Sequence, residues 1–96
     1  MEVRVKYEVK LSEEDPALLF NDALDALDRG DIARAVQQLE AFLSMESEDA
    51  EAIVILAKSE RTLGHVDRAE VRLSGLLSWS PLDVDAMIEL ADIKLE

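Results

Sequence analysis

The sequence predicts an all-α fold, an αα-hairpin superhelix preceded by one N-terminal β-strand. Three observations lead to this prediction. Apolar and charged residues alternate with a period of two over residues 1–11, and the apolar period becomes helical after Pro16. In the helical part, four residue types recur at an offset of 34: Gly30 with Gly64, Arg34 with Arg68, Ala35 with Ala69, and Leu39 with Leu73. A fixed period of this size is typical of stacked helical repeats.

Size, charge and composition limit the class of protein. The 96 residues suffice for one domain, and 22 acidic against 10 basic residues give a net charge of −12. Such a field repels phosphate backbones and anionic lipids, so we expect no nucleic-acid partner and no membrane surface. It favours a basic partner, or else it serves solubility alone. Residues 1–11 lack the apolar core of a signal peptide, and no apolar run is long enough to span a bilayer, so a cytoplasmic protein is expected.

Residues 1–12 form the predicted N-terminal strand arm. Valine, tyrosine and leucine fall on one side of it and charged residues on the other, as in a strand with one buried face. A lone strand is marginal in water and leaves unpaired backbone groups, so it needs a pairing partner. We expect homodimerisation by strand pairing or exchange between two chains, or addition to a partner's sheet. The candidate oligomerisation residues are Val3, Val5, Tyr7 and Val9.

The helical period predicts helices at roughly 16–29, 32–45, 50–63, 66–79 and 83–95. An aspartate precedes four of them and can accept backbone N–H groups as an N-cap: Asp15, Asp31, Asp49 and Asp83. Gly30 and Gly64 stand where a helix would end in a left-handed residue, a conformation that glycine adopts without strain. The connections are short, so neighbouring helices must run antiparallel.

Small residues and one repeat signature connect these hairpins to a known family. Leu56-Ala57, Ala69-x-x-x-Leu73 and Pro81 match a 34-residue pattern of leucine–glycine, alanine-x-x-x-phenylalanine and proline. On these residues the chain resembles the tetratricopeptide repeat (TPR) family. The resemblance covers a helical domain at 13–96, with repeats at about 16–49 and 50–83 and a final helix at 83–96. The family's tyrosine is replaced by Ala26 and Glu60, so the match is divergent.

The resemblance implies that the first helix of each repeat lines a concave surface that receives peptides. The positions it assigns to that surface, and that we take as candidate binding residues, are Phe20, Leu24, Leu27, Val54, Lys58, Arg61 and Ile88. Phe20, Leu24 and Leu27 form a helical stripe, a pattern that is more often part of a core than of a ligand site. Lys58 and Arg61 lie one helical turn apart and could grip a peptide carboxylate. Alternatively they pair with Glu51, Glu60 or neighbouring acids.

The last helix repeats the start of the previous repeat, with Asp83-Val84-Asp85-Ala86-Met87 matching Asp49-Ala50-Glu51-Ala52-Ile53. Two interpretations fit. In one, the helix caps a complete small protein; in the other, the chain is part of a longer array. In the second case Ile88 and Leu95 would partly face a further repeat. Stacked repeats expose the apolar surface of their last member unless something covers it.

No pattern for catalysis or for a cofactor is visible. The chain has no nucleophile beside a base and no phosphate-binding glycine loop, and its only histidine, His65, falls in a turn. Gly75 lies inside an expected helix, where it costs about 1 kcal/mol relative to alanine, and we expect it to permit a close contact. The sequence therefore predicts a non-catalytic protein–protein interaction module, a scaffold or adaptor. The alternative is a structural unit that homo-oligomerises through its N-terminal strand.

Overall fold

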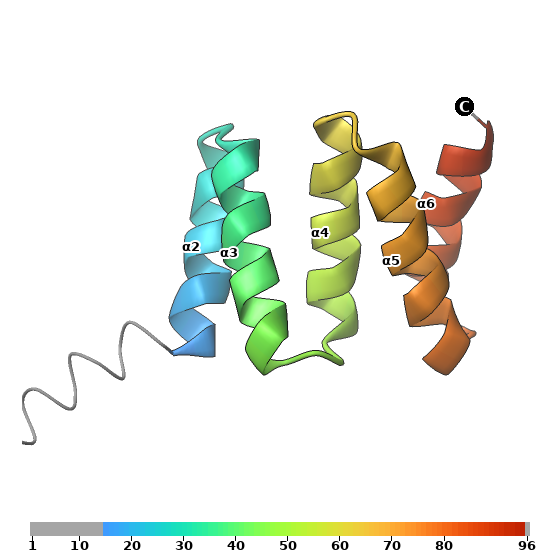
Figure 1. Ribbon diagram of the computed structural model, residues 1–96, viewed down its shortest axis with the longest axis horizontal. Helices are drawn as coiled ribbons and strands as arrows, with labels where there is room; N and C mark the ends of the chain where they lie inside the picture. Colours follow the sequence, from blue (N-terminus) through green and yellow to red (C-terminus); the bar gives the residue numbers. More distant parts are fainter. Residues whose placement is uncertain (1–14, 96) are drawn as a thin grey trace, which may run out of the picture.

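A computed structural model describes residues 15–95 and places five α-helices in them (Figure 1). They are α2 (Pro16–Asp28), α3 (Ile32–Met45), α4 (Ala50–Thr62), α5 (Val66–Trp79) and α6 (Val84–Leu95). The predicted all-helical domain is thus confirmed over this range, with each helix within one residue of its predicted bounds. The predicted strand, including Val3, Val5, Tyr7 and Val9, lies outside the described residues and stays a prediction.

Aspartate side chains begin four of the five helices, as the sequence predicts. Asp15 Oδ1 accepts the N–H of Ala17 at 2.9 Å, which satisfies one of the free backbone donors at the start of α2. The same contact recurs, at 2.9 to 3.2 Å, in the pairs Asp31–Arg34, Asp49–Ala52 and Asp83–Ala86. At the start of α5 the cap position holds His65, whose side chain makes no capping hydrogen bond.

Glycine ends the first helix of each hairpin. Gly30 and Gly64 have φ values of 81° and 88°, in the left-handed region that other residues rarely enter. The residue after each glycine donates its N–H back to the helix: Asp31 to the carbonyl of Ala26 and His65 to that of Glu60, both at 2.8 Å. This six-residue closure turns the chain sharply and sends the next helix back antiparallel.

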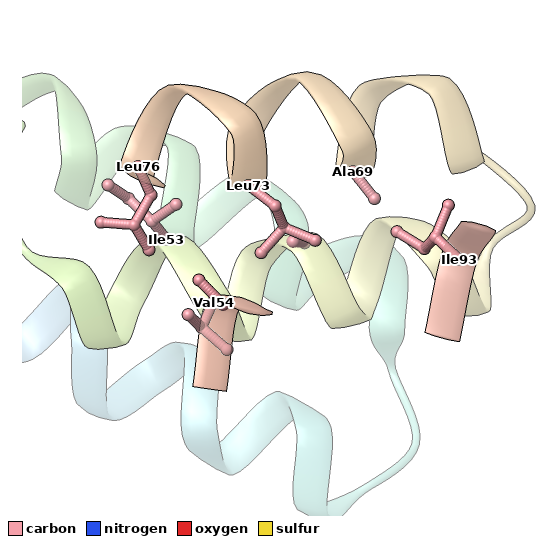
Figure 2. Close-up of a cluster of buried hydrophobic side chains, with 8 residues drawn as sticks. Ile53, Val54, Ala69, Leu73, Leu76 and Ile93 are labelled. Carbon is pink, nitrogen blue, oxygen red and sulfur yellow. The ribbon is translucent and has the colours of Figure 1, made fainter. Parts of the chain in front are cut away.

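Each helix packs against the next one along the chain, and α4 also contacts α6 (Figure 1). Alanines permit the close helix contacts, because Ala23, Ala35, Ala57 and Ala69 are all completely or almost completely buried. One core cluster joins α2, α3 and α4 around Leu39. A second joins α4, α5 and α6 around Leu73 and Leu76, which point toward Ile53 and Val54 in Figure 2.

Candidate functional site

Helices α4 and α6 lie next to each other although α5 separates them in sequence. A hollow of about 420 Å³ opens between them, which we call the α4–α6 groove. It is lined by Ala50, Glu51, Val54, Ile55, Lys58, Asp83 and Asp85. Its rim is charged and its floor is apolar, because Glu51, Lys58 and Asp85 are exposed while Val54 is buried.

Lys58 and Arg61 reach across from α4 to a single carboxylate on α6. Lys58 Nζ lies 3.9 Å from Glu89 Oε2, and Arg61 Nη1 lies 3.4 Å from Oε1. The Glu89 side chain is only 15% exposed, so this shared ion pair is better shielded from solvent than an ordinary surface pair. Of the interpretations that the sequence left open, pairing with a neighbouring acid is therefore the one found here. A peptide carboxylate would have to compete with Glu89 for these cations.

The predicted apolar row on α2 is divided between packing and solvent. Phe20 is half-buried, and its ring centroid lies 5.3 Å from that of Phe42 in a tilted contact. Tilted aromatic pairs of this kind stabilise a fold by more than the apolar area that they bury. Leu27 is also half-buried, whereas Leu24 is exposed. Phe20 and Leu27 consequently contribute to the hairpin's own packing, and Leu24 is the member that faces solvent most.

The apolar candidates on α4 and α6 also differ in exposure. Val54 is 5% exposed and belongs to the second core cluster, where α5 and α6 cover it (Figure 2). Ile88 occupies the corresponding position 34 residues later and is 53% exposed. The same repeat position is therefore core in one hairpin and surface in the last helix. The predicted binding residues do not form one continuous exposed stripe.

A buried charge cluster escaped the sequence-based prediction. Glu60 has no exposed surface, and its Oε1 accepts the Nε–H of Arg72 on α5 at 2.7 Å. Arg72 also donates from Nη2 to Glu40 Oε2 on α3 at 2.9 Å, so one guanidinium joins three helices. Glu60 Oε2 is buried without a hydrogen-bond partner. The available signal was that Glu60 takes the repeat position of Ala26, a residue on the buried stripe of α2.

Other classes of site are not found among residues 15–95. No helix in this range is long and apolar enough to cross a bilayer. Nor does this part of the chain bring together three or more histidine or carboxylate side chains in an arrangement that could hold a metal ion. His65 is exposed at the start of α5, as expected for a turn residue.

Comparison with protein-family models gives no match, and comparison with curated proteins gives none either.

Proposed function

We propose that this chain is a non-catalytic protein-interaction module of the tetratricopeptide-repeat type, which binds a peptide or protein segment on the face formed by its first helices. The proposal keeps the scaffold or adaptor role that the 34-residue spacing suggests. The antiparallel hairpins and the contact between α4 and α6 support it, because this arrangement brings α4 and α6 side by side.

The observation that carries the proposal is the α4–α6 groove. Three carboxylates, Glu51, Asp83 and Asp85, line it against one lysine, and the chain as a whole carries a net charge of −12. Opposite charge steers an encounter and selects against like-charged partners. The half-buried Ile55 offers apolar surface on which the aliphatic part of a long cationic side chain can lie. The segment that fits is extended and rich in lysine or arginine.

Lys58 and Arg61 take a different role in this proposal from the one the sequence suggested. Both are held by Glu89, and Lys58 is the one that lines the groove and contributes a positive charge to it. The absence of catalysis is part of the proposal too. The groove lining includes no hydroxyl and no imidazole side chain that could serve as nucleophile or base.

The direct test is fluorescence anisotropy with a short labelled lysine- and arginine-rich peptide and an acidic peptide of equal length. We expect only the basic peptide to bind, with an affinity that falls as salt is added. Replacing Glu51→Gln together with Asp85→Asn should weaken binding about tenfold, equivalent to about 1.4 kcal/mol. The matched control carries Asp28→Asn and Glu48→Gln, an equal change of charge at exposed positions outside the groove. Equal weakening in both variants, or equal binding of both peptides, would reject the groove.

The second candidate function rests on the alternating residues 1–11. A strand with one apolar face needs a pairing partner, and a second copy of this chain would supply one with the same pattern. In that case the chain serves as a homo-oligomerisation unit, and Val3, Val5, Tyr7 and Val9 form its contact. Removal of residues 1–12 separates this candidate from the peptide-binding proposal, because it removes the strand and leaves the α4–α6 groove intact.

A further inference from the structure

The outward-facing sides of α2 and α6, the first and last described helices, differ in polarity. On α4, Ala52, Leu56 and Ser59 are buried, and Ala52 and Leu56 pack with the preceding hairpin. The residues 34 positions earlier, at the other end of the row, are Leu18, Asp22 and Asp25, and all three are exposed. Two carboxylates thus stand where the next hairpin has buried side chains. The outer face of α2 is suited to water.

The outer face of α6 is apolar and uncovered. It consists of the exposed side chains of Val84, Met87, Ile88, Ala91 and Leu95, which we call the α6 outer face. The repeat relates Met87 to Ile53, which is 9% exposed against 41% for Met87. Ala91 corresponds to Ala57, which is buried at 1%. The face that α4 buries is therefore exposed when the same pattern returns on α6.

The structure also shows what kind of element covers the equivalent face of α4. On α4 it is helix α5, which contributes an alanine and two leucines at i, i+4 and i+7: Ala69, Leu73 and Leu76 (Figure 2). Ala69 belongs to the same buried cluster as Ala57 of α4, and two small side chains let helix backbones approach. Ala91 keeps that small side chain on α6. An amphipathic helix with the same small residue and leucine spacing would meet an equivalent surface on α6.

Charge decides between a second copy and another protein. Asp85 and Asp92 are exposed along one edge of the α6 outer face. Antiparallel two-fold pairing of two α6 helices brings equivalent edges together, so these carboxylates would face their own copies between two chains that each carry −12. Among residues 15–95, α5 carries this stripe and α3 carries a similar one that ends in Phe42, and both helices already bury it. A helix of a different protein with cationic flanks avoids both the repulsion between carboxylates and the need for a stripe that is already buried.

We propose that the α6 outer face binds an amphipathic helix of a partner protein, one that carries a small–x–x–x–Leu–x–x–Leu stripe with lysine or arginine on its flank. This surface shares Asp85 at its edge with the α4–α6 groove, but its apolar residues, Ala91 among them, do not line that groove. Helix-in-groove recognition of this kind reads residues one helical turn apart.

The test uses a labelled synthetic peptide with the sequence of residues 65–80, in which Asp67→Lys and Glu70→Lys supply the basic flank. We expect it to bind the full chain at least tenfold more tightly than the same peptide with Arg68→Glu and Arg72→Glu. In the protein, Ala91→Glu should weaken binding of the basic peptide at least tenfold. Ala33→Glu is the matched control, because Ala33 is also an exposed helical alanine, on α3, and should leave the affinity unchanged.

Circular dichroism melting of both variants accompanies the titration, and equal melting temperatures show that Ala91→Glu acts on the surface and not on folding. Three results would overturn the proposal. The basic peptide could fail to bind, or it could bind the Ala91→Glu and Ala33→Glu variants equally. Sedimentation could also find the chain alone to be a dimer that Ala91→Glu dissociates, in which case a second copy covers the face. Asp85 borders both surfaces, so the Glu51→Gln and Asp85→Asn variant does not separate them. Ala91→Glu does, because it should leave binding of the extended basic peptide in the α4–α6 groove unchanged.

Discussion

Arg72 Nε lies 2.7 Å from Oε1 of Glu60, a carboxylate with no exposed surface at all. A charge at such a site is tolerated only when an opposite charge and hydrogen bonds compensate for its lost hydration. Arg72 supplies both from the facing helix and extends to Glu40 on α3. This cluster stabilises one particular alignment of α3, α4 and α5, because another alignment would leave Glu60 without its cation.

Replacing Arg72→Ala should lower the free energy of unfolding by about 3 kcal/mol or more, because it leaves a buried carboxylate unpaired. Urea denaturation followed by circular dichroism measures the change. The control is Arg29→Ala, which removes an ion pair with Asp25 between two largely exposed side chains on α2 and its cap. That change should cost no more than about 0.5 kcal/mol. A loss for Arg72→Ala as small as that of the control contradicts the assigned role of the cluster.

Replacing glycine by alanine should change the stability in opposite directions at Gly64 and at Gly75. Gly64→Ala should destabilise the chain by about 1–2 kcal/mol, because φ at this position is 88°. Gly75→Ala should stabilise it by about 1 kcal/mol, because an added Cβ there would meet no atom within 4 Å and alanine is the better helix former. Thermal melting of the two variants side by side decides the matter. Changes of the same sign in both would contradict the assignment.

The missing cap at α5 is a position where stability can be gained. His65 occupies the place that aspartate takes at the other four helices, and its side chain makes no capping bond. His65→Asp should add an acceptor for the free N–H groups and a negative charge at the positive end of the helix, raising stability by about 1 kcal/mol. Asp31→Ala, which removes the corresponding cap on α3, should lower stability by a similar amount. A melting temperature unchanged by either substitution argues against side-chain capping as the cause.

Helix ends were predictable from the sequence because their chemistry is local. Aspartate before a helix and glycine after it act within three to five residues, and Asp49 and Gly30 are found in the predicted roles. Glu60 could not be placed in this way. Its burial depends on Arg72, one helix further along, and in so acidic a sequence only the repeat position that it shares with Ala26 singles it out.

The candidate site was less predictable than the helix ends for the same reason. Helix geometry alone predicts that Lys58 and Arg61 lie one turn apart. Glu89 comes from α6, which lies beside α4 only because the helices stack. Val54 was expected on the surface and lies in the core, because α5 and α6 together cover that side of α4. The expectation of a close contact at Gly75 was wrong, since no neighbouring atom requires glycine there.

Removing residues 1–12 tests the N-terminal strand. If Val3, Val5, Tyr7 and Val9 join two chains, sedimentation equilibrium should give a dimer mass for the full chain and a monomer mass for the truncated one. The control replaces Glu2→Gln and Glu8→Gln, changes on the polar side of the predicted strand, and should remain dimeric. A monomer mass before and after truncation leaves no place for strand-mediated assembly, and it does not affect peptide binding in the α4–α6 groove.

Replacing Lys58→Ala together with Arg61→Ala tests whether the groove binds a cationic or an anionic segment. Both cations are engaged with Glu89, so their removal leaves that carboxylate beside the acidic groove without its present partners. For a basic segment we expect the affinity to rise about fivefold, corresponding to about 1 kcal/mol from one partly shielded charge. Titration of the same labelled basic peptide against wild type and variant measures it, with melting curves to confirm that both are folded. A fall in affinity would instead mean that these cations grip a carboxylate of the bound segment, the role first suggested by their spacing on α4. Unchanged affinity would place both residues outside the binding site.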